Sequence, residues 1–154
     1  GIPPNGALGP QGTAPSLMAA DASLSGLDMV GLDAPGIDLR RADLSRASIF
    51  EANLRDAHLE GANMTGAQLG GAHLERANLR GATLAGVRAQ AADFTGADLS
   101  GAKLDKADLA LARLDGADLC DADLSTARLD RATMEGARSC PGTRWPPDAE
   151  VPSP

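Results

Sequence analysis

The chain has 154 residues and a formal net charge of −7, and aromatic residues make up only 2% of it. It contains no run of about 18 apolar residues and no charged segment followed by an apolar one, so neither a membrane span nor a secretion signal is visible. The length fits one domain, and we expect a cytoplasmic protein.

Residues 1–21 are expected to form a flexible lead-in. The first 20 residues contain no charged side chain and are rich in Gly and Pro, a composition typical of linkers. The sequence begins with Gly1 rather than Met, which leaves open whether it is a processed protein, an expression product or a piece of a longer chain.

A five-residue repeat occupies residues 22–139. Every fifth residue from Leu39 to Met134 is large and apolar, except Ala89. Ala stands two residues before nearly all of them, and 18 of the 19 sites from 42 to 132 are Ala, the exception being Val87. In an α-helix a step of five residues advances about 500°, which would scatter the apolar residues over every face. The period therefore excludes a continuous helix.

The same period fits a short strand followed by a turn. In a strand, residues i and i+2 share a face, so Ala42 and Leu44 point inward while Asp43 points to solvent. The two remaining residues must turn the chain, and Gly adopts the positive φ angle of a turn without steric cost. The second turn residue is Gly at positions 26, 31, 36, 61, 66, 71, 81, 86, 96, 101, 116 and 136. A corner every five residues closes the backbone into a coil, and stacked coils form a solenoid.

The frame A-(D/N)-L-x-G resembles that of the pentapeptide-repeat proteins over residues 22–139. The resemblance implies an all-β fold, a right-handed, four-sided parallel β-helix with 20 residues per coil. At the spacing of neighbouring strands, the repeats make about six coils and a rod of about 28 Å. The four sides come from the resemblance, because the spacing alone shows only the repeated corner.

Two irregularities point to the same coil length. Ala89 is the one small residue of the Leu column, and the next pentad carries the only aromatic residue of that column, Phe94. Either Phe94 fills the space that Ala89 vacates, with Val87 filling the rest, or the two changes are unrelated. Charges also alternate at a step of 20, which predicts that Arg40, Glu60 and Arg80 stack on one face and that Arg55 and Glu75 stack on another.

Both ends of the repeat differ from its middle. The first coil carries Leu27, Leu32 and Ile37 where later coils carry Ala, and these larger residues would plug the open end of the tube. Residues 140–154 are rich in Pro and are predicted to leave the strands as a cap and tail. Trp145 is expected either to fold over the last coil as a lid or to remain exposed as an anchor for a partner or a second subunit. A homodimer through an end of the rod is compatible with the second alternative.

Cys120 and Cys140 are 20 residues apart, so they would occupy the same face of successive coils. Their Cα atoms would then be about 5 Å apart, within the range that a disulfide permits. The expected cytoplasmic location favours free thiols, and the parallel Cβ directions are unfavourable for the bond. A metal site would need two further ligands, and the nearest His is distant in sequence, so we expect no metal.

No catalytic constellation is visible, and we expect no enzyme activity and no cofactor. His58 and His73 occupy outward positions on different faces and fit solvated surface imidazoles. The Asp residues of A-D-L recur with the frame and are predicted to line an exposed surface rather than a cleft. The glycines occur singly at corners, so they do not form a phosphate-binding loop.

Surface recognition is the remaining class of function, and charge is the guide to it. Residues 93–130 hold nine Asp against four basic residues. An acidic surface repels nucleic acid and attracts basic partners, so we expect no direct nucleic-acid binding. The predicted acidic patch consists of Asp98, Asp105, Asp118, Asp121 and Asp123.

The sequence thus predicts a non-catalytic protein-interaction scaffold or spacer with an unidentified protein partner. The alternative comes from the resemblance, because the pentapeptide-repeat family includes bacterial proteins that bind DNA gyrase by presenting a rod similar to duplex DNA. Residues 22–139 carry 18 acidic and 13 basic residues, or about one net charge per 5–6 Å, whereas duplex DNA carries one per about 1.7 Å. Binding to a gyrase or another topoisomerase is therefore the second hypothesis.

Overall fold

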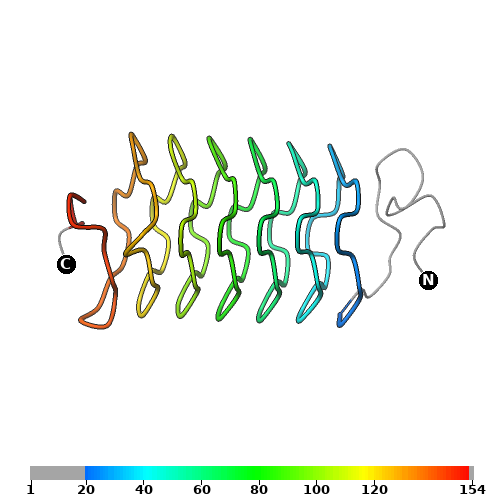
Figure 1. The fold of residues 1–154 in the computed structure, drawn as a ribbon, viewed down its shortest axis with the longest axis horizontal. Coiled ribbons are helices and arrows are strands. Elements are labelled where there is room, and N and C mark those ends of the chain that lie inside the picture. The colour runs from blue at the N-terminus through cyan, green and yellow to red at the C-terminus, as the bar shows by residue number, and fades with distance from the viewer. Residues whose placement is uncertain (1–19, 153–154) are drawn as a thin grey trace.

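The structure is a computed structural model that describes residues 20–152. These residues wind into a coil whose turns stack along one axis, and the two ends of the described chain lie at opposite ends of the resulting rod (Figure 1). Most of the predicted lead-in, residues 1–19, lies outside the described residues.

Each side of the coil contributes a single residue to a parallel β-bridge, and bridged residues are 20 apart except at the last bridge. Four ladders therefore run along the rod, starting at Ser23, Asp28, Asp33 and Asp38. Residues 20–152 contain no helix and no strand longer than one residue, and hence no helix that could cross a membrane. The coil of four pentads and 20 residues is confirmed.

Four of the five backbone N–H groups in a pentad bond to backbone carbonyls. In the pentad of residues 42–46, Asp43 donates to the previous coil, whereas Leu44 and Arg46 donate to the next. The N–H of Ala42 closes a turn by donating to the carbonyl three residues earlier. These N···O distances are 2.7–3.1 Å. The N–H of Ser45, the first corner residue, is left without a backbone partner.

That fifth N–H donates to the Asp or Asn side chain two residues earlier. The N–H of Ser45 lies 3.0 Å from Asp43 Oδ1, and the Ser45 hydroxyl donates to the same oxygen at 2.6 Å. Asp or Asn in the A-(D/N)-L frame therefore completes the backbone hydrogen bonding of the corner. The side chains that accept this bond belong to Asp28, Asp38, Asp43, Asn53, Asn63, Asn78, Asp93, Asp98, Asp108, Asp118 and Asp123.

The second corner residue has a left-handed backbone in every pentad from Asp21 to Gly136 except at Thr126. The predicted corner glycines all have positive φ angles, between 63° and 73°. Residues with side chains adopt the same conformation where Gly is missing, for example Arg41 with a φ of 58° and Leu111 with a φ of 63°. Because an L-residue is disfavoured there by about 1–2 kcal/mol, the coil imposes this geometry on the residue.

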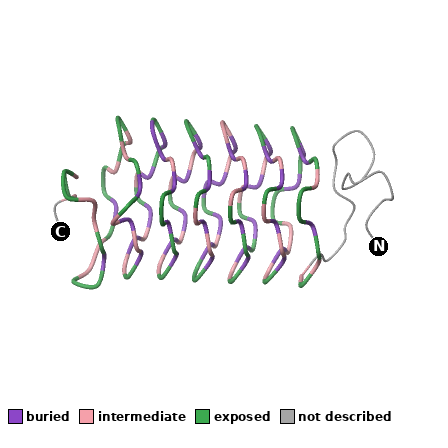
Figure 2. Cartoon of the chain, in the orientation of Figure 1, coloured by how far each residue is buried: buried purple, intermediate pink, exposed green. Residues whose placement is uncertain are grey.

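The interior is a narrow column of Leu and Ala side chains. Figure 2 shows buried residues recurring on each coil along the rod. Leu44, Met64, Leu84, Leu104 and Leu124 are all 0% exposed, which confirms the predicted inward column. At the N-terminal end, the larger residues of the first coil behave as a plug. There Leu32 is buried, and Leu27 and Ile37 are half-buried against the core.

The C-terminal segment continues the coil further than predicted. Residues 140–154 were expected to lie outside the strands, but Arg144 forms a parallel bridge with Asp123. The spacing of this bridge is 21 residues, because one extra residue is accommodated in the turn at 140–143, where Thr143 N–H donates to the Cys140 carbonyl at 2.9 Å. The segment therefore adds one rung before it leaves the rod.

The predicted charge stacks form only in part. Arg55 pairs with Glu75 across neighbouring coils, as expected. Arg40 instead pairs with Asp38 of its own pentad, at 2.7 Å, and Glu60 lies 3.7 Å from the Nδ1 atom of a histidine in its own pentad. Arg40, Glu60 and Arg80 do lie in one column, as predicted. Arg40 and Glu60 form no ion pair, because the corner arginine reaches the nearer carboxylate two residues before it.

Candidate interaction surface

The predicted acidic patch is partly neutralised by the coil that follows it. Asp98 and Asp118 are bridge partners in successive coils, as expected. However, Asp118 Oδ2 lies 2.9 Å from Arg138 Nη1, and Asp123 Oδ2 lies 3.7 Å from Arg144 Nη1. The second pair depends on the 21-residue step, which the uniform frame does not predict.

Three of the five carboxylates in the patch are also committed to the backbone. Asp98, Asp118 and Asp123 each accept the N–H of the residue two positions on, at 2.9, 3.0 and 3.0 Å. The Ser125 hydroxyl and N–H lower the pKa of Asp123 by stabilising its charged form. These aspartates therefore have a structural role, and their recurrence does not by itself indicate a binding site.

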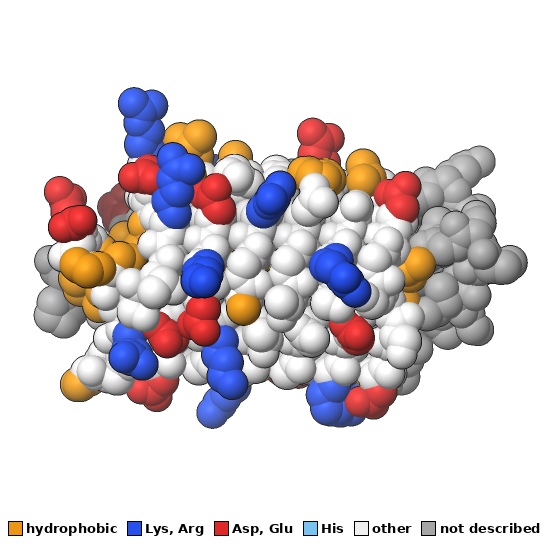
Figure 3. Space-filling view, in the orientation of Figure 1, with side chains coloured by type: hydrophobic (Ala, Val, Ile, Leu, Met, Phe, Trp, Pro, Cys, Tyr) orange, Lys and Arg blue, Asp and Glu red, His pale blue; other side chains and the backbone are white. Residues whose placement is uncertain are grey.

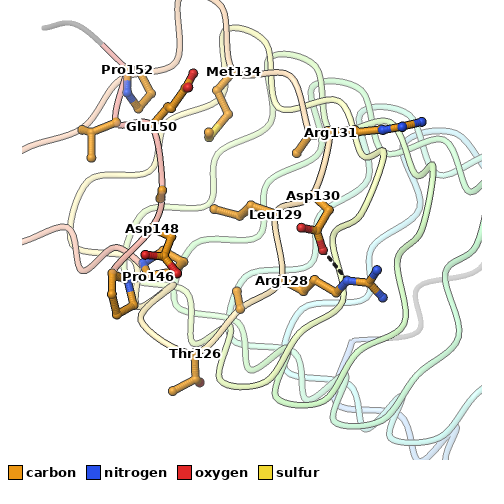
Figure 4. A pocket seen from close by; sticks show the side chains of 15 residues that line it. Thr126, Arg128, Leu129, Asp130, Arg131, Met134, Pro146, Asp148, Glu150 and Pro152 are labelled. Carbon is orange, nitrogen blue, oxygen red and sulfur yellow. Dashed lines mark hydrogen bonds and ion pairs between the residues drawn. The ribbon is translucent and has the colours of Figure 1, made fainter.

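The C-terminal end of the rod is covered incompletely. Trp145 is half-buried and packs against the core, which is the arrangement expected of a lid. A hollow of about 780 Å³ remains between the last coil and the tail, and Figure 4 shows Leu129 and Met134 facing Pro146 and Pro152 across it. The end of the apolar column is thus partly accessible.

The two histidines do not approach each other. His58 lies beside Glu60, and His73 Nδ1 lies 3.1 Å from Glu75 Oε1, in a cluster that includes Arg55. The structure therefore places each ring at the surface beside a carboxylate of its own pentad. They do not combine with each other as a metal or catalytic pair.

Cys120 and Cys140 form a disulfide in the structure, with their Cα atoms 4.9 Å apart. The stacking of the two residues in successive coils brings them to this distance. The bond ties the turn at 140–143 to the preceding coil.

One corner of the coil carries apolar side chains. We call it the apolar corner, and it consists of the corner pairs at 30–31, 50–51, 70–71, 90–91 and 110–111. Hydrogen bonds link these pairs in order along the rod, from the N–H of Gly31 to the Phe50 carbonyl at 2.8 Å through to Ala91 and the Ala110 carbonyl at 3.0 Å. Figure 3 shows exposed hydrophobic side chains along one edge of the rod.

The large hydrophobic side chains exposed on the coils all lie at this corner. Val30, Phe50 and Leu111 are 53%, 38% and 54% exposed, and the other exposed large hydrophobic residue between 20 and 152 is in the tail. The ring of Phe50 lies over Gly70, where an added Cβ would be 3.1 Å from Phe50 Cδ1. Glu51 is the one charged residue of the apolar corner, and Gln90 is polar; the next pair along the same edge of the rod is Asp130 and Arg131, which are both charged.

Leu111 is unfavourable in two respects. Its φ of 63° lies in the left-handed region, where a bulky residue is rare, and its side chain is more than half exposed. Neither property stabilises the rod. The left-handed backbone is shared with other second corner residues, such as Arg41 and Lys106, so the exposed apolar side chain is what distinguishes Leu111.

The charge pattern alone does not reveal the apolar corner. The signal that finds it is the arrangement of the sequence in rows of 20, because Val30 and Phe50 then share one column and Leu111 falls in the adjacent column of the same corner.

Comparison with known proteins gives a family and a fold. The model of the family described as pentapeptide repeats (8 copies) matches residues 22–61, 42–81, 72–109 and 107–138. No curated protein matches the sequence.

Several solved structures are similar. The pentapeptide repeat protein Rfr23 from the cyanobacterium Cyanothece 51142 is 25% identical, with a TM-score of 0.66, over 77% of this chain and 90% of that one. QnrB1, a plasmid-mediated fluoroquinolone resistance protein, is 21% identical in a trypsin-treated form, with a TM-score of 0.56, over 84% of this chain and 67% of that one. The likeness to QnrB1 concerns the fold alone.

Proposed function

The chain belongs to the pentapeptide-repeat family and folds as a right-handed, four-sided parallel β-helix, and from this premise we propose that it is a non-catalytic scaffold that binds a protein partner through the apolar corner. The observation that carries the proposal is Leu111, which exposes an apolar side chain on a strained backbone. Elsewhere on the coils the large apolar side chains point inward and are buried or half-buried.

The shape of the apolar corner defines the kind of partner. Val30 and Leu111 are separated by four coils, or about 19 Å at the spacing of neighbouring strands. The corner is a convex ridge, so it fits an elongated apolar groove. Burial of side chains such as Phe50 and Leu111 would contribute about 25 cal/mol for each Å² of apolar surface removed from water.

The experiment compares the retention of proteins from source lysate by the wild-type rod and by Leu111→Gly. Gly relieves the left-handed strain and removes the apolar side chain, so this variant should be at least as stable as wild type and should lose the partner. Lys106→Gly is the matched control, because Lys106 has a φ of 56° on a different corner. Both variants should gain up to about 1 kcal/mol of stability.

Only Leu111→Gly should lose the retained protein, and Phe50→Ser should weaken its retention. Equal retention by wild type and Leu111→Gly would contradict the role of the apolar corner. A wild-type rod that retains no protein under the same conditions would contradict the scaffold function itself.

Binding to a topoisomerase is the second candidate. The excess of Asp in residues 93–130 supports a basic partner, and Asp105 and Asp121 of the acidic patch form no ion pair within residues 20–152. The pairing of Asp118 and Asp123 with arginines weakens the comparison with duplex DNA. We therefore rank this candidate second.

A further inference from the structure

The turn at 140–143 brings two sulfur atoms and a carboxylate together. The Sγ atoms of Cys120 and Cys140 and a carboxylate oxygen of Asp121 all lie within 4.8 Å of one another. Asp121 Oδ1 is 3.4 Å from Cys140 Sγ. Because a disulfide sulfur carries no hydrogen, it cannot donate a hydrogen bond to this carboxylate.

The position of the Asp121 carboxylate depends on a glycine. A Cβ atom at Gly142 would lie 1.9 Å from Asp121 Oδ1, so a side chain at that position would displace the oxygen. Gly142 belongs to the turn that contains the extra residue, and it follows the end of the regular frame. The irregular turn therefore leaves a space beside Cys140 that the carboxylate occupies.

Hydrogen bonds that do not involve sulfur hold the backbone of the cluster. The N–H of Cys140 donates to Thr143 Oγ1 at 3.1 Å, and the hydroxyl of the buried Thr143 donates to the Leu119 carbonyl at 2.8 Å. The N–H of Cys120 donates to Asp118 at 3.0 Å. Reduction of the disulfide would leave these bonds in place, so both thiols would stay on neighbouring rungs.

The reduced cluster would concentrate negative charge without a compensating cation. Arg138 and Arg144, on the neighbouring rungs, pair with Asp118 and Asp123. Within residues 20–152 no Lys or Arg forms an ion pair with Asp121. A divalent cation between two thiolates and a carboxylate would supply the missing positive charge.

We propose that the dithiol form of the protein binds Zn²⁺ through Cys120, Cys140 and Asp121. A dithiol reductant, as present in the expected cytoplasmic location, would donate two electrons and two protons to the disulfide and itself become a disulfide. Binding of Zn²⁺ would then release the two thiol protons. Thiolate and carboxylate are both zinc ligands, and water would complete the four-coordinate site.

The spacing of the ligands suits a tetrahedral ion. Two sulfurs bound to zinc at about 2.3 Å are about 3.8 Å apart at a tetrahedral centre. Side chains on neighbouring coils whose Cα atoms are 4.9 Å apart reach this separation. The sequence predicts no metal because two further ligands would be needed and the nearest His is distant, and only the turn at Gly142 shows Asp121 beside the sulfurs.

The test uses the full chain and two metal ions as probes. The protein is reduced with a phosphine, and Co²⁺ is titrated while the thiolate-to-cobalt charge-transfer absorption is recorded. We expect saturation at one Co²⁺ per chain and loss of the band when Zn²⁺ is added. The oxidised protein is the first control and should show no band, because its sulfurs are not thiolates.

Three variants separate the ligands from the surrounding charge. Cys120→Ser should abolish the charge-transfer band or reduce it to that of a single thiolate. Asp121→Asn should lower the affinity by about tenfold, a loss that even outer-shell groups of metal sites produce. Asp105→Asn is the matched control, since it removes another exposed carboxylate of the acidic patch and should leave the affinity unchanged. Circular dichroism establishes that each variant is folded.

Three results would overturn the proposal. The first is the absence of a charge-transfer band in the reduced wild-type protein. The second is an unchanged affinity in Asp121→Asn, which would show that the carboxylate is not a ligand. The third is saturation at one ion per two chains, which would place the site between molecules.

Discussion

Asn and Asp share one position in successive pentads because both carry an oxygen that reaches the N–H two residues on. The bond is 3.0 Å at Asp43 and 3.1 Å at Asn63, so the charge of the side chain is not required for it. The acidity of the chain is therefore in part a by-product of corner chemistry. The side-chain oxygen is needed for the fold, because it accepts the corner N–H. The choice between Asp and Asn changes only the charge of the surface.

Replacement of Asn63 tests this role without changing a charge. Asn63→Ala removes the acceptor for the Thr65 N–H and hydroxyl, so we expect the free energy of unfolding to fall by about 1 kcal/mol. Asn63→Asp keeps the oxygen and should change stability little. Gln68→Ala, at an equivalent position without such a bond, is the control. Urea midpoints measure all three, and equal losses in the two Ala variants would refute the role.

Acid should destabilise the protein over a defined pH range. The Arg40 guanidinium holds the pKa of Asp38 at about 2, below its ordinary value of 3.8, and the Ser45 hydroxyl and N–H lower the pKa of Asp43. Because these pKa values are lower in the folded state, unfolding takes up protons in acid. The stabilisation is complete above about pH 5 and is lost as the pH falls through 3.8 towards 2.

Urea midpoints between pH 6 and pH 2 measure this effect. They should be constant near neutrality and fall in the acid range, and Asp38→Asn should make the fall shallower. A midpoint that rises as the pH falls below 4 would contradict the direction of the pKa shifts.

At the scale of the coil, the repeated features could be predicted from the sequence and the singular ones could not. The inward column, the corners and the 20-residue coil follow from a period that recurs many times. The bridge at Arg144 depends on one extra residue in a turn, and the Asp118–Arg138 pair depends on the last coil remaining regular. The 21-residue step to Arg144 has no second instance in the sequence from which a pattern could be recognised, whereas the 20-residue Asp–Arg step recurs at Asp93–Arg113 and Asp108–Arg128.

That the ring of Phe94 fills the space left by the small side chain of Ala89 stays a prediction. Both side chains are 0% exposed, as is Val87. Phe94→Ala should cost about 3–5 kcal/mol by leaving a cavity, and Ala89→Leu should cost about 1–3 kcal/mol by overpacking. If the residues share one space, the double variant should be more stable than the sum of the single changes predicts.

Denaturant unfolding of the single and double variants measures the coupling between the two sites. The control combines Ala89→Leu with Leu44→Ala, which lies more than two coils away and should be additive. Additivity in both pairs would show that the changes at Ala89 and Phe94 are unrelated.

At the scale of the whole molecule, the candidate binding surface could be predicted only in part. The acidic excess is visible in the sequence, but its neutralisation by Arg138 and Arg144 requires the register of the last coil. Leu111 appears in the sequence as one more leucine, and its strain and exposure become apparent only once the corner has been assigned. Every column of corner residues on a rod is exposed to solvent. A binding surface is therefore recognised by the columns that depart from the pattern of polar residues outside and apolar residues inside.

The acidic coils provide the last prediction. If they imitate DNA, the purified rod should inhibit gyrase supercoiling or protect gyrase from quinolone-stabilised cleavage, and salt should weaken the effect by screening. Replacing four aspartates of the acidic patch by Asn should abolish it. Three of them keep their corner bonds as Asn, so the fold should survive; the set is Asp98, Asp118, Asp121 and Asp123.

Two aspartates at the other end of the rod serve as a control, which shows whether the effect on gyrase depends on the acidic patch or on any acidic residue. Asp38→Asn and Asp43→Asn should change the effect on gyrase little, because Asp38 is already paired with Arg40 at 2.7 Å. Supercoiling and cleavage that are unchanged by micromolar wild-type rod at low salt would exclude the topoisomerase function. Binding through the apolar corner would then be the remaining function. An apolar contact at Leu111 does not depend on charge, so this result would leave it untouched.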